Sequence, residues 1–343
     1  MLRLFHSIFG GGEEKDHYPE SLIEMAIERA VDGTYPRLRA MSGYRKRLRA
    51  PVIHAIDHVM ALVDQLPRPL PAISSAYSAD PRLPALFVSP EHMREVFAND
   101  PVLGEFRKSH PEGADSITAL LLAQRREKNI LGIELDGELM RRDVRQVTVG
   151  FSNHRLADPA ATEDEARRQL KRRAFDHLLS LALFNISEAK DERAELNHER
   201  ELLRCKLNVL EKGGWSFEDQ GGKHIDVRSV QTELEAIEGQ LAALSVDDRT
   251  LSGQLDMVTD LLSDAEKQLW AEPVDFHVDS MNIKRDAQDP HARPIHFNEL
   301  HNTRGESLAI LFVSLDPREL PQGDAFLAGA DRLLGEPVSS FRP

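Results

Sequence analysis

The chain has 343 residues, of which 41% are hydrophobic and 29% are charged, and its formal net charge is -14. This length is enough for two or three domains, and the composition is typical of a soluble, helix-rich protein. The acidic charge repels nucleic acid and anionic lipid, so either ligand would need a local basic patch. The one cysteine, Cys205, excludes an internal disulfide and favours a reducing compartment, so we expect a cytoplasmic location.

Residues 1–12 have the pattern of an amphipathic peptide followed by a glycine linker. Leu2, Phe5, Ile8 and Phe9 would lie on one face of a helix, and three glycines follow them. Such a peptide can rest on a membrane surface or dock in a groove of a partner, which predicts a weak, peripheral membrane contact. The alternative is a disordered or self-packed terminus.

Residues 13–128 are predicted to form a helical domain. Apolar residues recur at helical spacing, the first helix should end at Gly33, and a proline-rich connector should follow the second helix at 67–71. The other expected features are a start of the second helix near Thr34 or Pro51, helices at 90–98 and 115–128, and a strand at 86–89.

A basic patch without acidic residues stands out in this acidic chain. It contains Arg45, Lys46, Arg47 and Arg49, with further arginines shortly before them. The patch predicts contact with a phosphate-bearing ligand, an anionic membrane or an acidic partner. The alternative is that these side chains pair with carboxylates of the same chain.

Two histidines lie four residues apart on the expected second helix, with an aspartate between them. The spacing of His54, Asp57 and His58 is similar to the HxxEH motif, in which two histidines bind zinc and a carboxylate acts as the base. Aspartate is shorter than glutamate, however, and no third ligand follows. We therefore interpret the set as a polar helix face and predict no bound metal or cofactor, with a metal-dependent hydrolase as the alternative function.

A second histidine set, His291, His296 and His301, has five-residue spacing. Five residues rotate a helix by about 140° and change the face of a strand, so regular structure would separate these side chains. Only a loop could bring them together, with His277 as a further candidate. The pattern favours separate histidines over a metal site.

A β domain is predicted from residues 129–152 together with 272–316. Alternating apolar residues on both sides of Asp136-Gly137 indicate a β-hairpin. Downstream, a second alternating segment and a strand that is apolar on both faces are expected. Because an isolated hairpin is marginally stable in water, all these strands should share one sheet.

The strongest pattern in the chain predicts a coiled coil within residues 153–271. Apolar residues at alternating steps of three and four occupy twelve of thirteen positions from Val227 to Leu269, over six heptads. A similar stripe runs from Phe175 to Leu210. Folding the chain back between the two stripes would form an antiparallel helical hairpin, or arm.

The tip of this arm is expected near 213–222, where two glycine pairs break the helices. Trp215 and Phe217 lie in this tip and are predicted either to anchor a protein partner or to cap the last apolar layer. In the antiparallel register, Arg193 would lie within one heptad of Asp248 and form a buried polar layer.

The arm is acidic, because residues 163–270 contain twenty-three Asp and Glu but fifteen Lys and Arg. This charge argues against nucleic acid binding along the arm. The chain also lacks the glycine-rich phosphate-binding motifs and the GxSxG motif of serine hydrolases.

The expected fold is therefore α+β and mainly α. It consists of the N-terminal helical domain, a small β-sheet domain with a long antiparallel coiled-coil hairpin inserted between its strands, and a C-terminal tail at 317–343. Such an arm offers length but no concave pocket. We predict a non-enzymatic adaptor, scaffold or assembly subunit that binds a protein partner or a second copy of itself, giving a homo-oligomer. A peripheral membrane protein is the third alternative.

Overall fold

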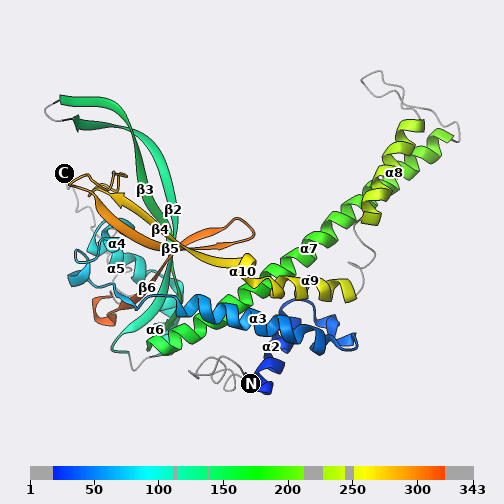
Figure 1. Cartoon of the computed structure of the whole chain (residues 1–343), viewed down its shortest axis with the longest axis horizontal. Helices are drawn as coiled ribbons and strands as arrows, with labels where there is room; N and C mark the ends of the chain where they lie inside the picture. The colour runs from blue at the N-terminus through cyan, green and yellow to red at the C-terminus, as the bar shows by residue number, and fades with distance from the viewer. Residues whose placement is uncertain (1–17, 111–113, 137–138, 212–226, 244–250, 321–343) are drawn as a thin grey trace, which may run out of the picture. The chain divides into compact units, whose positions relative to one another are not determined.

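The computed structural model describes residues 18–110, 114–136, 139–211, 227–243 and 251–320. These residues belong to two compact units, which are coloured by residue number in Figure 1. Among these residues, the sheet unit contains 59–173 and 269–320, and the helical unit contains 18–58 and 174–268. None of the helices in these described ranges combines the length and the apolar character that crossing a membrane would require.

The sheet unit contains a six-stranded sheet with the spatial order β3-β2-β6-β5-β4, in which β1 also pairs with β6. Neighbours along that path are antiparallel, and β1 is parallel to β6. The strands are β1 (Leu70–Pro71), β2 (Ile117–Asp136), β3 (Leu139–Ala160), β4 (Leu269–Val278), β5 (Arg293–Asn302) and β6 (Ser307–Leu315). The predicted β-hairpin, formed by β2 and β3, and the single shared sheet are confirmed. The long helix α7 (Glu163–Glu211) lies between β3 and β4 in the chain.

Both faces of this sheet are covered, which explains why residues 308–313 of β6 are all apolar. One face packs on residues from α4 (Arg82–Leu86), α5 (Pro90–Ala98) and α6 (Pro101–Ser109), including Leu83 and Phe97. The opposite face packs on Val63 at the end of α3 (Tyr44–Asp64) and on Leu170 in α7. β6 alternates between the two clusters and lies between β2 and β5, so the prediction of a central strand is confirmed.

Arg167, near the start of α7, caps the end of α3 within the sheet unit. Its guanidinium donates hydrogen bonds to the carbonyl oxygens of Val63 (2.8 Å), Leu66 (3.0 Å) and Pro67 (3.1 Å). These carbonyls belong to the end of a helix, where no partner is available within the helix itself. The bonds therefore replace the missing helical ones and fix the connector that follows α3.

Strand β3 contains three bulges, each at a residue with a left-handed backbone. The β2–β3 pairing shifts register opposite Asp143, Asn153 and Asp158, whose φ angles are 59°, 54° and 50°. Aspartate and asparagine tolerate this region better than other non-glycine residues, because their short polar side chains bond locally. Each bulge adds one residue to β3 and increases the local twist, so the two long strands coil around each other.

The helical unit is built from α2 (Glu20–Gly33), most of α3 and α7, and three later helices. These are α8 (Val227–Ala243), α9 (Leu251–Ser263) and α10 (Ala265–Gln268). The predicted end of the first helix at Gly33 is confirmed. Ile27, Val31, Val52, Ile56 and Leu178 form part of its buried interior, each at most 2% exposed.

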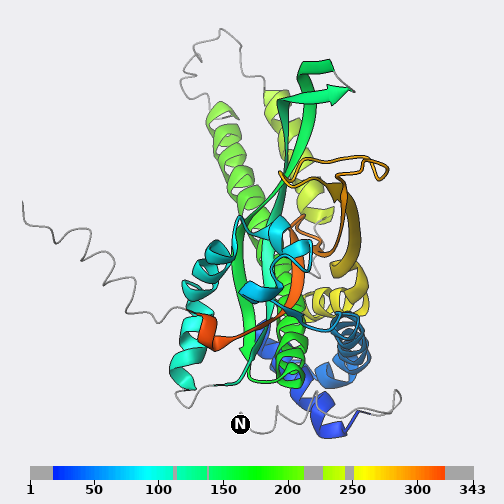
Figure 2. The ribbon, with the colours of Figure 1, turned by 90° about the vertical axis from the view of Figure 1, so that its left-hand side faces the viewer.

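Burial along α7 and α8 follows the three-four spacing of the predicted stripes. Between residues 187 and 207 of α7, the covered positions are 189, 193, 196, 197, 200, 203 and 207, and all others are exposed. Between 228 and 241 of α8, the covered positions are 230, 234, 237 and 241. Both views show α8 lying beside the C-terminal part of α7 (Figures 1 and 2). Each of these two segments is thus buried along one narrow stripe only.

α9 differs from α8, because it is buried on more than one side. Leu255, Val258, Leu261 and Leu262 are at most 4% exposed, and even Gln254 is buried. The stripe predicted from Val227 to Leu269 therefore has two burial patterns, because α8 is covered along one stripe whereas α9 is buried on more than one side. The helix also ends before the predicted position, since Leu269 is the first residue of β4.

Some local predictions were wrong. Residues 115–128 were expected to be helical, but β2 begins at Ile117. This strand is buried on both faces, so its apolar run shows no alternation and resembles a buried helix. The strand expected at 86–89 is absent, because Leu86 ends the helix α4. The second helix begins at Tyr44 and contains Pro51. Tertiary packing of this helix outweighs the unfavourable helix propensity of an internal proline.

Candidate functional site

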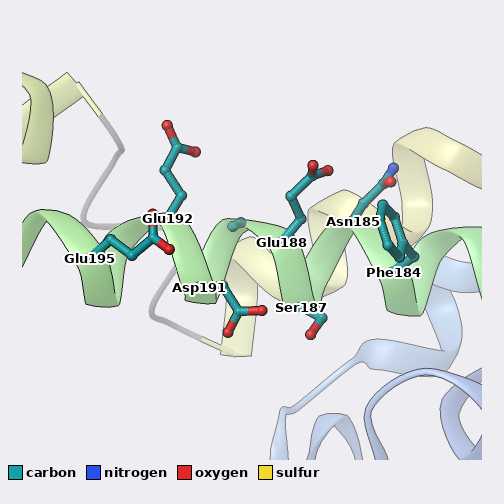
Figure 3. A pocket seen from close by; sticks show the side chains of 8 residues that line it. Phe184, Asn185, Ser187, Glu188, Asp191, Glu192 and Glu195 are labelled. Carbon is teal, nitrogen blue, oxygen red and sulfur yellow. The ribbon is translucent and has the colours of Figure 1, made fainter. Parts of the chain in front are cut away.

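One recess of about 660 Å³ is lined, among the described residues, entirely by α7. Figure 3 shows its side chains, with Glu188 and Glu192 pointing to the same side of the helix. The lining residues are Phe184, Asn185, Ser187, Glu188, Ala189, Asp191, Glu192 and Glu195. Four of the eight are carboxylates, so the recess presents a concentrated negative charge at neutral pH.

Apolar side chains border this acidic surface. Leu183 is 44% exposed and Phe184 is 38% exposed, whereas the preceding Leu181 and Ala182 are buried. None of the four carboxylates of the recess forms an ion pair with another residue that the structure describes. An exposed aromatic residue beside uncompensated carboxylates is suited to a partner that carries both apolar and cationic side chains.

An ion pair joins α7 and α8. Arg204 Nη2 lies 2.7 Å from Glu238 Oε1, and both side chains are about half exposed. Each residue directly follows a covered position, Leu203 on α7 and Ile237 on α8. Exposed pairs of this kind contribute at most about 1 kcal/mol, so this pair adds little to stability.

Several predicted features lie outside the described residues. These are the tip residues Trp215 and Phe217, the aspartate of the polar layer Asp248, and the amphipathic residues Leu2, Phe5, Ile8 and Phe9. Arg193, the other member of the predicted polar layer, lies on the covered stripe of α7. The pairing of Arg193 with Asp248 stays a prediction.

The basic patch lies on and before the start of α3, and its arginines contact carboxylates of the helical unit. Arg45 Nε donates to Glu28 at 3.0 Å, and Arg49 Nη2 donates to Glu20 at 2.7 Å. Arg47 pairs with Asp256 and is 3.2 Å from the Ser252 hydroxyl. Lys46 is exposed. The arrangement agrees with the alternative that the patch complements acids of the same chain.

Glu28 is the centre of this network. The Tyr44 hydroxyl donates to it at 2.6 Å, and the guanidinium groups of Arg39 and Arg45 approach it at 2.9 Å. The hydrogen bond from Tyr44, followed by those from the two arginines, lowers the pKa of Glu28. The carboxylate is therefore held in its charged form, which ties η1 (Pro36–Ala40) and α3 to α2.

The first histidine set does not converge on one point. His54 Nε2 lies 2.8 Å from Glu266, and Asp57 accepts a hydrogen bond from the Tyr18 hydroxyl at 2.5 Å. The hydrogen bond with His54 is the largest cause that lowers the pKa of Glu266. In the described part of the chain, no group of three or more His, Cys, Asp or Glu side chains is arranged to hold a metal ion.

The second histidine set is separated in the way that its spacing predicts. His296 pairs with Asp275 at 2.6 Å on one face of β5, and His301 lies on the other face, stacked on Trp270 with ring centroids 5.6 Å apart. His291 is exposed in the turn before β5. His277 lies on β4, across from Pro294. The structure therefore does not gather these residues.

Sequence reasoning missed a pair of histidines that the fold brings together. His154 on β3 stacks on Phe87 with centroids 4.9 Å apart, and His92 on α5 approaches the His154 ring edge-on at 6.4 Å. Burial first, and then the neighbouring His92, lower the pKa of His154. No local motif could reveal this pair, because 62 residues of chain separate its members.

No protein-family model, curated protein or solved structure matches this chain.

Proposed function

We propose that the protein is a non-enzymatic adaptor or assembly subunit. In this proposal α7 and α8 form an antiparallel coiled-coil hairpin, and the hairpin binds a protein partner. Its supporting observation is the burial pattern described above. From residue 187 onward, each helix covers a single stripe at three-four spacing and exposes everything else, so no third helix packs on the pair among the described residues.

A two-helix seam of this kind buries little apolar surface, but it leaves most of the surface of both helices exposed. Only seam residues such as Ile237 and Leu241, each 7% exposed, contribute burial. All remaining positions stay available for contacts, and coiled coils align them at regular intervals. The acidic recess with Phe184 and Leu183 supplies one such contact surface.

The chemistry of the recess indicates the kind of partner. Four carboxylates attract a cationic surface and accelerate its association, and Phe184 offers an apolar anchor at the same place. We therefore propose a partner segment that is basic and amphipathic, such as a helix with alternating apolar and Lys or Arg residues. Trp215 and Phe217 remain proposed anchors at the tip.

The hairpin itself can be tested by a thiol cross-link across the Arg204–Glu238 pair. Arg204→Cys and Glu238→Cys are introduced together in a Cys205→Ser background, which removes the native thiol. We expect a short bifunctional maleimide to join the two thiols within one chain, seen as a change in gel mobility, because the ends of these two long side chains lie 2.7 Å apart. Arg204→Cys with Gln240→Cys is the matched control, because Gln240 is also exposed and lies about 200° around α8 from Glu238. Equal cross-linking of both pairs would show that the two helices are not held in this alignment.

Partner binding is tested with Phe184→Ala, Glu192→Lys and Leu202→Ala. Leu202 is 57% exposed on the same helix and lies outside the recess, so it controls for loss of exposed apolar surface. A captured protein is purified and its dissociation constant is measured with each variant. We expect an increase of about tenfold or more for the two recess variants, the range of interface hot spots, and little change for Leu202→Ala. Equal affinities for all variants would rule out the recess, and Trp215→Ala with Phe217→Ala tests the tip in the same assay.

A further inference from the structure

The connection between α4 and α5, residues 86–88, is held in place by side chains from other parts of the sheet unit. The Tyr77 hydroxyl donates a hydrogen bond to the carbonyl oxygen of Phe87 at 2.7 Å. The backbone N–H of Val88 donates to His92 Nδ1 at 3.3 Å. The position of this connection therefore depends on a few polar side chains, one of which is a histidine.

Phe87 is the buried residue of the connection, and aromatic rings surround it. It is 1% exposed and stacks on the His154 ring, with centroids 4.9 Å apart. Its ring also lies edge-on to Phe97 at 5.4 Å and to His92 at 6.0 Å. Two of the three rings around Phe87 are thus imidazoles, so its burial depends on their charge.

The contacts of both histidines suit their neutral forms. His154 Nε2 is buried without a hydrogen-bond partner, so a proton there would create a buried donor that lacks an acceptor. His92 Nδ1 accepts the bond from Val88, and a proton on this atom would remove the acceptor. The two ring centroids lie 6.4 Å apart, so two charged rings would also repel each other.

The charged groups around His154 do not offset this preference. Asp100, before α6, is buried and accepts the backbone N–H groups of Leu103 at 2.9 Å and Leu156 at 2.8 Å. The other charged side chains on α4, α5 and α6, on β3 beside His154 and on the loop at 279–285 are paired or at least partly exposed. The pairs are Asp80 with Arg82, Glu91 with Arg94, Asp279 with Arg285 and Glu127 with Lys284, and the partly exposed groups are Glu95, Glu105, Arg107, Lys108 and Arg155. Burial, and then His92, lower the pKa of His154, and no carboxylate contributes to the shift.

We propose that His92 and His154 act as a pH-dependent latch on the connection 86–88. At neutral pH the uncharged rings hold Phe87 and Val88 in place. Below about pH 6.5, proton uptake by the two rings favours a form in which the connection has moved away and water reaches both imidazoles. This opening exposes Phe87 next to Val88, which is already 89% exposed, and so creates an apolar surface. The latch lies within the sheet unit and does not rest on the proposed function.

Hydrogen exchange of the full chain tests the latch, with each rate divided by that of an unstructured peptide at the same pH. The reporters are the amides of Phe87, which donates to Leu83 at 2.9 Å, and Met93, which donates to Ser89 at 3.0 Å. Because the closed form binds protons less readily than the open form, opening becomes more favourable as the pH falls below about 6.5. We expect protection of these amides to fall by at least about tenfold from pH 7 to pH 5, and to recover when the pH is raised again.

Urea at concentrations below the unfolding transition distinguishes a local opening from global unfolding. A local opening exposes little surface, so urea should leave exchange at Phe87 and Met93 nearly unchanged at pH 5. The amides of residues 309–313 in β6 should exchange faster in urea, because they depend on global unfolding.

Two substitutions remove the titrating groups while keeping their neutral contacts. His154→Phe keeps an aromatic ring against Phe87, and His92→Asn keeps an acceptor for the N–H of Val88. His154→Phe should reduce the change in protection between pH 7 and pH 5 to less than about threefold, and the double variant should reduce it further. His296→Gln is the matched control, because His296 pairs with Asp275 on the same sheet and lies outside the latch, and it should leave the change intact.

The latch is refuted if protection of Phe87 and Met93 stays constant from pH 7 to pH 5. It is also refuted if urea accelerates these amides as strongly as those of β6, since the opening would then be global. An unaltered pH dependence in the folded double variant would assign the effect to other groups. Should a variant fail to fold, the two measurements on the unaltered chain still decide the question.

Discussion

Arg125 on β2 and Glu299 on β5 form an ion pair that reaches across the intervening strand β6. Arg125 Nε lies 2.5 Å from Glu299 Oε1, and Nη2 lies 3.3 Å from Oε2. Glu299 is 4% exposed, and the hydrogen bond that Arg125 donates to Glu299 raises the pKa of Arg125. The Glu299 carboxylate is therefore buried inside the sheet unit, and Arg125 is the main cation that compensates its charge.

Replacement of Arg125 by an uncharged residue should destabilise the sheet unit. Arg125→Met leaves the Glu299 carboxylate buried, so we expect the sheet unit to lose about 2–4 kcal/mol of stability, somewhat below a fully buried pair because Arg125 is partly exposed. Arg125→Met with Glu299→Met should recover most of this loss. Urea unfolding monitored by Trp270 fluorescence, in a Trp215→Phe background, measures both. A double variant as unstable as the single one would contradict the expectation.

The bulge at Asn153 gives a second prediction. Asn153 has a φ of 54° and its side-chain amide donates to Gln124 at 2.8 Å. A β-branched residue is strained at this angle, so Asn153→Val should cost about 2 kcal/mol or more, whereas Asn153→Gly avoids the strain. Equilibrium unfolding of the two variants compares them at one position. Equal stabilities would show that the backbone angle does not matter here.

The half-buried pair of His92 and His154 should make the stability of the sheet unit depend on pH. Burial and His92 lower the pKa of His154 below its unfolded value, while a hydrogen bond with the backbone of Leu86 opposes this. The unfolded chain thus binds the proton more readily than the folded one. Stability should fall as the pH drops below about 6.5, with a slope of at most about 1.4 kcal/mol per pH unit from this group.

His154→Phe, which keeps an aromatic ring against Phe87, should reduce this slope between pH 7 and pH 5. His92→Ala should reduce it in part, because it removes the second cause of the shift. The comparison with the unaltered protein cancels the contribution of exposed histidines. An unchanged slope in His154→Phe would assign the pH dependence to other groups.

The seam between α7 and α8 should be sensitive at its covered positions only. Ile237→Ala removes a side chain that is 7% exposed, and we expect a loss of about 2–3 kcal/mol in local stability. Leu202→Ala, at an exposed position of α7, should change it by less than about 0.5 kcal/mol. Hydrogen exchange of α8 amides reports this directly, and the amides of β6 should be unaffected.

The stripes of covered residues on α7 and α8 could be predicted from sequence because their signal is local and periodic, whereas the coiled-coil hairpin itself stays a prediction. Twelve apolar positions at three-four spacing specify a stripe without knowledge of any partner. Burial along α7 and α8 follows this stripe. The same argument failed for α9, whose stripe is also apolar but packs inside the helical unit, since periodicity alone does not tell a seam from a core face.

Long-range contacts account for most of what sequence reasoning could not foresee. The helix expected at 115–128 is a strand because β2 pairs with both β3 and β6, and β6 lies far along the chain. The basic patch has the composition of a ligand site, but Glu20 and Glu28 lie on another helix that supplies its acids. His92 and His154 meet only because β3 passes beside α5.

The bulges of β3 also change how its sequence must be read. Val149 and Leu156 are an odd number of residues apart, yet both belong to the same apolar cluster, with Asn153 between them. Ala157 and Ala160 likewise share the opposite cluster, on either side of Asp158. Each left-handed residue therefore resets the parity of the strand, and deleting one would invert the inward and outward order of the residues up to the next.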